Sequence, residues 1–207
     1  MEPDSLGMIL AVAAAGGLVV LTCTHSLVSG PRSRTGAVAL LGMLLYLLVL
    51  LLRPSSLILS NGALLLAATS VGAMVGLALG SRGAILMFCL IMAMVDSFPF
   101  NEGLTRRLLE AYAATDGDLL RYVALTIPVE DRILPVIGIA DLLVVSALHS
   151  GLYLLSMPTL VSVGVLLASL LVAVLIGLSA GGVPALPVIA AGAAILMLAR
   201  PNVGRHR

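Results

Sequence analysis

The chain of 207 residues has no lysine and no tryptophan, and it has little charge of either sign. Charged residues make up 10% of it, against about 25% in an average soluble domain. Hydrophobic residues make up 60% and the mean hydropathy is +1.18, so the composition is that of an integral membrane protein. The net charge is +1 and basic runs are absent, so nothing in the composition points to nucleic-acid binding.

Cysteine is scarce as well, because Cys23 and Cys89 are the only two thiols. Both lie in apolar stretches, so we expect neither a disulfide nor a metal site from them. No His-Glu-x-x-His sequence occurs, which excludes that zinc protease motif, and we expect no cofactor. The acidic residues Glu2 and Asp4 stand where a signal peptide has basic ones, so we expect the first apolar run to stay in the mature protein.

The apolar stretches predict one all-α membrane domain over residues 1–207, a polytopic bundle of about seven transmembrane helices. A helix needs about 20 apolar residues to cross the hydrocarbon core. The spans predicted by that length are residues 6–28, 36–52, 57–80, 83–97, 133–148, 159–178 and 183–199. The arginines divide almost evenly between the two sides of such a bundle, so they do not orient it.

A polar segment, residues 100–132, separates the first four spans from the last three and carries most of the acidic residues. Within it, residues 104–114 predict a short amphipathic helix lying on the surface. Residues 119–129, LLRYVALTIPV, are rich in β-branched and aromatic side chains, which fit a short strand equally well. The segment therefore leaves two kinds of local structure open.

Two aspartates are the only acidic residues inside apolar stretches: Asp96 near the end of the fourth span and Asp141 in the fifth. An ionised aspartate at the centre of a membrane helix costs about 2.5–3.5 kcal/mol, so each is expected to face the bundle interior. The two spans are antiparallel neighbours, and the aspartates lie about one and two turns from the polar segment. We expect their carboxyls to meet and share one proton, an arrangement that can activate a water and protonate a peptide carbonyl.

Three short motifs accompany these aspartates. Gly138-Ile139-Ala140-Asp141 is similar to a Gly-x-Gly-Asp motif, Val95-Asp96 to a Tyr-Asp motif, and Pro184-Ala185-Leu186 to a Pro-Ala-Leu motif. In this order, the set resembles the presenilin and signal peptide peptidase family of intramembrane aspartyl proteases. The resemblance covers about residues 83–200, and the three spans within residues 1–82 take the place of the third to fifth of the family's nine. Val95 and Ala140 depart from the family's tyrosine and glycine.

The resemblance implies an enzyme, an intramembrane-cleaving aspartic endopeptidase with Asp96 and Asp141 as its catalytic residues. It further implies that substrate lies against Gly138, Ala140, Pro184, Ala185 and Leu186. The implied substrates are transmembrane or signal-peptide-like polypeptides within the lipid bilayer. Small members of the family act without an obligatory partner, and the resemblance implies a multi-pass protein of a prokaryotic cytoplasmic membrane.

Two other interpretations of the aspartate pair stay open. A proton- or cation-coupled transporter could bind its ion at the same carboxylates, and the Gly-Gly-Val-Pro break at residues 181–184 suits its discontinuous helices. No inverted repeat supports that alternative. A protonated pair that merely joins two helices is the structural interpretation.

Other candidate residues carry weaker signals. Residues 177–181, Gly-Leu-Ser-Ala-Gly, spell the nucleophile-elbow pattern, but no strand precedes them, so we interpret Ser179 as a turn residue. His25 and His149 stand at predicted span ends, where interfacial hydrogen bonding is expected.

Overall fold

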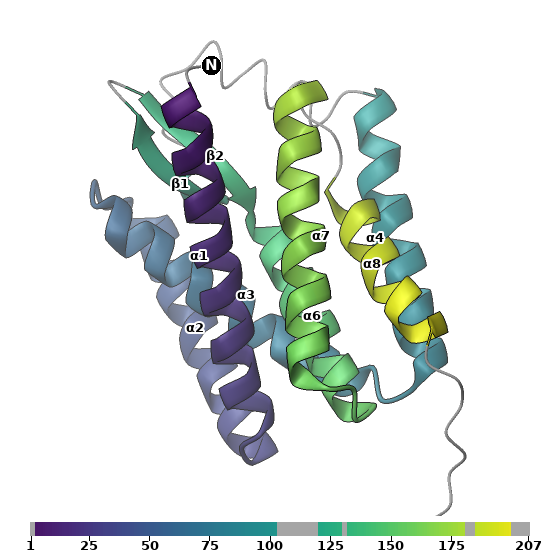
Figure 1. Cartoon of the computed structure of the whole chain (residues 1–207). Helices are drawn as coiled ribbons and strands as arrows, with labels where there is room; N and C mark the ends of the chain where they lie inside the picture. Colours follow the sequence, from purple (N-terminus) through teal and green to yellow (C-terminus); the bar gives the residue numbers. More distant parts are fainter. Residues whose placement is uncertain (1–2, 103–119, 130–131, 181–184, 200–207) are drawn as a thin grey trace, which may run out of the picture.

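Most of the chain is helical in the computed structural model, which describes residues 3–102, 120–129, 132–180 and 185–199 (Figure 1). The α-helices within these residues are α1 (Pro3–Val28), α2 (Arg32–Leu52), α3 (Leu57–Ala78), α4 (Arg82–Glu102), α6 (Ile139–Leu154), α7 (Thr159–Ala180) and α8 (Leu186–Ala199). A short 3₁₀ helix, η1 (Leu120–Tyr122), leads into an antiparallel hairpin of β1 (Ala124–Val129) and β2 (Arg132–Gly138). The predicted all-α class is confirmed in its helical content, with one hairpin added.

Four of the described helices are long and apolar enough to cross a membrane: α1 over Leu6–Val28, α2, α3, and α7 over Thr159–Ser179. Helices α6 and α8 are shorter, with 16 and 14 residues. At about 1.5 Å per residue they are about 24 and 21 Å long, less than the hydrocarbon core of about 30 Å. Both begin part-way between the ends of the longer helices (Figure 1).

Helix α6 packs closely against α3 through two glycines. A Cβ atom added at Gly72 would lie 2.5 Å from the carbonyl oxygen of Leu143, and one added at Gly76 would lie closer still to that of Ala147. The helices approach this closely because neither glycine has a side chain. The small residues of α3 therefore set its distance from α6.

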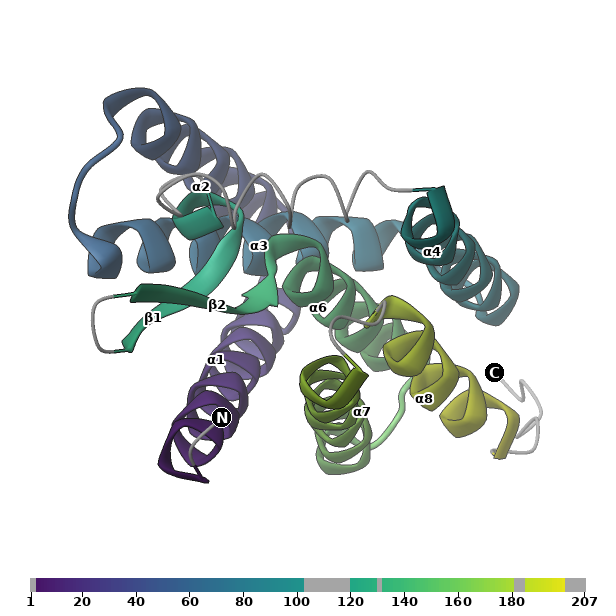
Figure 2. The same cartoon turned by 90° about the horizontal axis from the view of Figure 1, so that it is seen from above.

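A buried hydroxyl cluster ties the same two helices to α1. The Ser146 hydroxyl on α6 donates to the carbonyl oxygen of Thr69 on α3 at 2.7 Å, and Thr24 Oγ1 on α1 lies 2.8 Å from Ser146 Oγ. These contacts give polar groups partners inside an apolar bundle, where an unpaired hydroxyl is costly. Seen from above, α6 lies between α3 on one side and α7 and α8 on the other (Figure 2).

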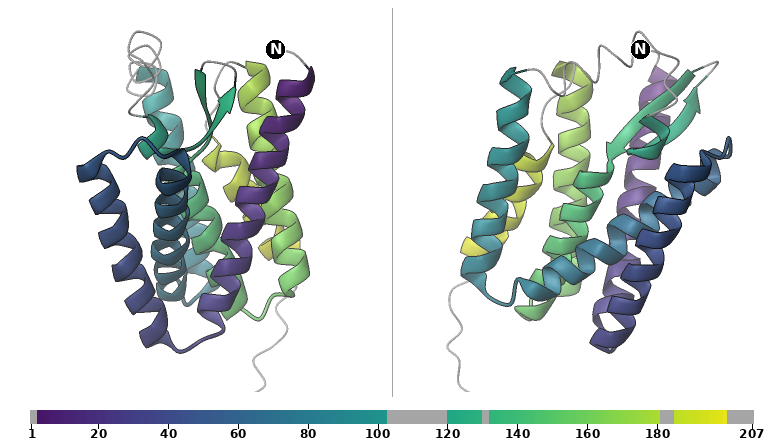
Figure 3. Two further views of the ribbon diagram at one scale, coloured as in Figure 1. Left: turned by 90° about the vertical axis from the view of Figure 1, so that its left-hand side faces the viewer. Right: turned by 180° about the vertical axis from the view of Figure 1, so that it is seen from behind.

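Helix α4 lies at the edge of the bundle, beside α8 (Figures 2 and 3). Among the α4 side chains that the structure describes, those of Ile85 and Cys89 are buried, whereas Met87 and the other large side chains of the outer face are exposed. At its N-terminal end, the Arg82 guanidinium donates to the carbonyl oxygen of Met197 near the end of α8. Helix α4 is thus held mainly by its neighbour α8.

The fifth predicted span, residues 133–148, is wrong at its start. Residues 132–138 form strand β2, and α6 begins only at Ile139. An apolar run of this length fits a buried strand as well as a helix, and the β-branched residues Ile133, Val136 and Ile137 favour the strand. Hydrophobicity alone could not distinguish the two.

The end of that span is wrong as well, because no break occurs at His149. Helix α6 continues to Leu154, and the chain turns at Ser156, whose φ is 56°, just before Pro158. Within the helix, the Ser150 hydroxyl donates to the carbonyl oxygen of Ser146 at 2.9 Å, so it needs no turn to find a partner. Polar residues had suggested an interface where the structure has a buried helix.

Some of the remaining sequence predictions are confirmed, and others lie outside the described residues. Helices α1, α3 and α7 begin and end within a few residues of their predicted spans. The strand alternative for residues 119–129 holds for β1. The amphipathic helix expected at residues 104–114 and the break expected at residues 181–184 lie outside the described residues.

Candidate functional site

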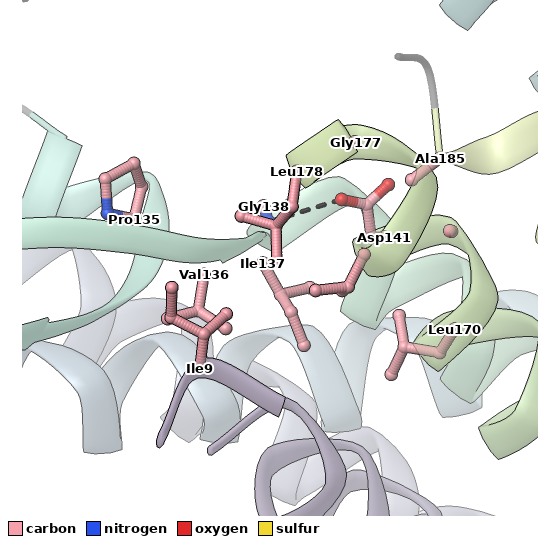
Figure 4. A pocket seen from close by; sticks show the side chains of 12 residues that line it. Ile9, Pro135, Val136, Ile137, Gly138, Asp141, Leu170, Gly177, Leu178 and Ala185 are labelled. Carbon is pink, nitrogen blue, oxygen red and sulfur yellow. Dashed lines mark hydrogen bonds between the residues drawn. The ribbon is translucent and has the colours of Figure 1, made fainter. Parts of the chain in front are cut away.

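The aspartate of the Gly-x-x-Asp sequence, Asp141, lies where β2 passes into α6. It is the third residue of the helix, so it stands in the first turn and not in the middle of an apolar helix as predicted. Its Oδ2 accepts a hydrogen bond from the main-chain N–H of Gly138 at 3.2 Å (Figure 4). A carboxyl is favoured there because the first N–H groups of a helix lack intrahelical partners and carry partial positive charge. The start of α6 therefore determines where Asp141 stands in the bundle.

The second aspartate, Asp96, is half-buried on the inner side of α4. Its Oδ2 accepts a hydrogen bond from the main-chain N–H of Leu186 at 3.0 Å. Leu186 is the first residue of α8, so this carboxyl also meets the N-terminal end of a helix. Val95, which replaces the tyrosine of the resembling motif, is 56% exposed on the outer face.

A cavity of about 260 Å³ lies against the Asp141 side chain (Figure 4). Gly138 and Ala185 form part of its wall, and Ile9 of α1 and Leu170 of α7 form apolar parts of the wall. Among the described residues that line it, Asp141 has the one ionisable side chain. The arrangement is a mainly apolar chamber with a carboxyl at its edge.

Ala185 and Leu186 connect the two aspartates. Ala185 shares the cavity wall with Asp141, and the next residue donates its N–H to Asp96. Asp96, Asp141 and residues 185–186, which are widely separated in the sequence, are therefore linked where α6 and α8 begin.

The other residues expected at the site take different positions. Ala140 is exposed and is not among the residues that line the cavity. Leu186 has its side chain in the hydrophobic core and offers the site its main-chain N–H. Pro184 lies outside the described residues.

Strand β2 contributes part of the site that sequence reasoning missed. Pro135, Val136 and Ile137 line the cavity directly before Gly138. The signal for a strand was present in this β-branched run ending at a glycine, but its length also suited a helix. Nothing in the sequence pointed to Ile9, which comes from the far end of the chain.

Elsewhere in the described residues, the polar groups form no comparable site. The part of the chain that the structure describes has no group of three or more His, Cys, Asp or Glu placed to hold a metal. The ring centroids of His25 and His149 lie 5.9 Å apart, and His149 is 1% exposed, which corrects its expected interfacial position. Ser179 is helical rather than in a turn, and its hydroxyl donates to the carbonyl oxygen of Ile176 at 3.0 Å.

Comparison of the chain with models of protein families, with curated proteins and with solved structures gives no match. The resemblance to the presenilin family therefore rests on the three motifs.

Proposed function

We propose that the protein is an intramembrane aspartyl protease, which hydrolyses peptide bonds of transmembrane polypeptides with Asp96 and Asp141. The observation that carries the proposal is that consecutive residues at the start of α8 reach both aspartates: Ala185 lines the cavity beside Asp141, and the Leu186 N–H bonds to Asp96. Isolated acids are costly inside a membrane bundle, and a pair of them beside a cavity is a candidate for proton chemistry. The resemblance of the surrounding motifs to presenilins supports the same reaction.

We propose that the two carboxyls hold one water between them. In each aspartate Oδ2 accepts a main-chain N–H, from Gly138 for Asp141 and from Leu186 for Asp96. Each Oδ1 then remains for the water and for the proton that the pair shares. Because both main-chain donors belong to helix starts, they orient the carboxyls before any substrate arrives.

Hydrolysis proceeds in two steps, each with two proton transfers. The ionised carboxyl takes a proton from the water as the water oxygen bonds to the peptide carbonyl carbon, and the protonated carboxyl gives its proton to the carbonyl oxygen. The C–N bond of this diol then breaks, its nitrogen takes the proton from the first carboxyl, and a diol hydroxyl returns a proton to the second. The products are a carboxylic acid and an amine, and the pair is back in its starting state.

The substrate class follows from the walls of the cavity. Its apolar lining suits the side chains of a transmembrane or signal-peptide-like segment. A helical segment must open before its peptide carbonyl can reach the carboxyls, and its freed N–H and C=O groups then need partners. An extended segment can find them on the main chain of strand β2, next to Asp141.

The same proposal places the protein in the membrane. The four long apolar helices are compatible with insertion, and we propose that α4, α6 and α8 join them as a seven-span, multi-pass bundle in the cytoplasmic membrane of a prokaryote. The short α6 and α8 would then begin within the bilayer, where a site for membrane-embedded substrates has to be. We propose that the protein acts without an obligatory partner.

The test is cleavage of a transmembrane peptide by the purified full chain in liposomes. Asp141→Asn and Asp96→Asn keep the size of each side chain and remove its acid, so each is expected to slow cleavage about a thousandfold. The matched control is Asp118→Asn, which changes an aspartate of the polar segment and should leave the rate unchanged. Full cleavage by either of the first two variants would refute the proposal.

One observation favours a second candidate, a proton-coupled transporter. Two short helices begin inside the bundle and direct their first N–H groups to carboxyls, as the broken helices of transporters do at their ion sites. The same liposomes distinguish the two functions. Proton-driven solute uptake that depends on Asp141, with no peptide cleaved, would replace the protease by the transporter.

A further inference from the structure

Asn61, a half-buried residue of α3, makes an unusual set of contacts with strand β1. Its Nδ2 donates to the carbonyl oxygen of Thr126 at 2.8 Å, while its Oδ1 accepts the main-chain N–H of Thr126 at 3.1 Å. The same Oδ1 lies 3.3 Å from the Thr126 hydroxyl, which donates to it. A side-chain amide has one acceptor and a donor side by side, so it pairs with a strand residue as a neighbouring strand would.

These hydrogen bonds show that Asn61 occupies the outer edge of β1. The N–H and C=O of a strand residue point to the same edge, and alternate residues point to opposite edges. Thr126 therefore faces away from β2, and Pro128, two residues further, faces the same way and has no N–H to donate. The outer edge of β1 is thus capped by Asn61 at Thr126, and we place an extended substrate along the other strand, β2, which leads directly to Asp141.

The contact between Asn61 and Thr126, which we call the Asn61 clamp, lies at an irregularity of the hairpin. Leu125 is paired with Ile137 but the next residue, Thr126, is paired with Pro135, so Val136 is left as an extra residue on β2. Such a bulge interrupts the alternation of side chains, which allows residues 135–138 to line the cavity in succession. A shift of pairing by one residue would turn these side chains to the other face.

Helix α3 connects this clamp to the catalytic helix. The N-terminal end of α3, which carries Asn61, lies next to the hairpin (Figure 3), while Gly72 and Gly76 further along the helix pack against α6. One rigid helix therefore holds both the hairpin and the helix that carries Asp141. The distance between the β-bulge and the Asp141 carboxyl therefore depends on two contacts of α3, one with the hairpin and one with α6.

We propose that Asn61 is a positioning residue, which holds the register of the hairpin and thereby selects the peptide bond that is presented to the aspartates. This inference rests on the proposed protease function. A substrate strand laid along β2 keeps its place relative to Asp141 only while β2 keeps its own. Because strands advance about 3.3 Å per residue, a slip of one residue brings a neighbouring peptide bond to the water.

Other hydrogen bonds also hold the hairpin, so we expect the protein to fold without the Asn61 amide. Tyr46 Oη donates to the carbonyl oxygen of Tyr122 at 2.7 Å, and Ile139 N donates to that of Val123 at 2.9 Å. These bonds hold the residues that directly precede β1 on α2 and on the start of α6. Removal of the amide is therefore expected to loosen the bulge and to leave the bundle intact.

The experiment combines two measurements on the full chain in liposomes or detergent. Amide hydrogen exchange of β1 reports whether the clamp is lost, and mass spectrometry of the products reports which bonds of a transmembrane peptide are cut. For Asn61→Ala we expect exchange at Thr126 to rise about tenfold and the cuts to spread to adjacent bonds. The matched control is Gly62→Ala on the same helix, where an added Cβ meets nothing within 4 Å, so neither readout should change.

A second variant keeps the shape of the side chain. Asn61→Asp retains the acceptor for the Thr126 N–H and loses the donor for its carbonyl oxygen, so we expect less exchange than in Asn61→Ala with cuts still spread. Wild-type cuts in both variants, or unchanged exchange in Asn61→Ala, would overturn the positioning role. A wild-type chain that cuts nothing would overturn the protease, and the exchange measurement would still decide whether Asn61 holds the hairpin.

Discussion

The two helices that carry the aspartates are packed very differently. Helix α6 lies in the middle of the bundle, where α1, α3 and α7 surround it and residues 144–152 are all buried. Helix α4 lies at the edge, with Ile85 and Cys89 buried and most of its other large side chains exposed (Figure 2). Asp141 therefore stands on a fixed helix, while the position of Asp96 depends on the pairing of α4 with α8. Substitutions on the two helices should consequently differ in their effects on stability and on cleavage.

The largest effect is expected where α3 meets α6. Gly76→Leu would force a side chain against the backbone of Ala147, which has no room to yield, so the two helices must separate. Overpacking of a core costs about 3 kcal/mol and occasionally more, and here it also removes the hydroxyl contacts of Ser146. We expect loss of the folded monomer, measured by thermal unfolding in detergent, together with loss of cleavage.

The control for this change lies on the same helix. Gly62 has open space around its Cα, so Gly62→Leu inserts an equal side chain without a clash. It should retain the wild-type unfolding temperature. Equal stability of the two leucine variants would show that α6 is not fixed by α3, and the contrast with α4 would disappear.

A smaller effect is expected where α4 touches the bundle. Ile85 is fully buried, and its side chain occupies the space beside Gly151 of α6. Ile85→Ala would leave a cavity at the edge of the core and cost about 2 kcal/mol. Because α4 carries Asp96, we expect cleavage to slow by about tenfold at temperatures where the protein stays folded.

Met87 supplies the comparison for Ile85, since it lies on the exposed face of the same helix. Met87→Ala should change neither the unfolding temperature in detergent nor the cleavage rate. If Ile85→Ala unfolds the whole bundle as Gly76→Leu does, α4 is as central as α6. If it leaves the rate untouched, the position of Asp96 does not depend on this contact.

The sequence could predict which stretches are helical far better than how they meet. Length and hydropathy locate α1, α3 and α7, because a span of about 20 apolar residues has few other uses. The same reasoning failed at residues 133–138, since an apolar β-branched run is compatible with both a strand and a helix. It failed again at His149, where the polar side chain is buried within α6.

At the site, too, the sequence could predict the important residues but not the contacts between distant parts of the chain. Asp96 and Asp141 stand out because isolated acids are expensive in an apolar run. The position of Asp141 in the first turn of α6 involves a hydrogen bond with the N–H of Gly138. The contact of Asp96 with Leu186 depends on the packing of α4 on α8. Asn61 was overlooked because a single amide in an apolar helix has no pattern of its own. Its partner Thr126 lies 65 positions away.

The smallest effect is expected at the end of α4 that is remote from Asp96. The Arg82 guanidinium donates to the carbonyl oxygen of Met197, where the last carbonyls of α8 lack helical partners. Arg82→Gln shortens the side chain and removes its charge, which we expect to cost about 1 kcal/mol in detergent unfolding. The matched control is Arg32→Gln, because Arg32 is exposed at the start of α2. The rate of cleavage should fall less for Arg82→Gln than for Ile85→Ala, since the Asp96–Leu186 bond still joins α4 to α8 at the site. A larger fall would mean that the far end of the α4–α8 pair, and not the bond at the carboxyl, keeps Asp96 in place.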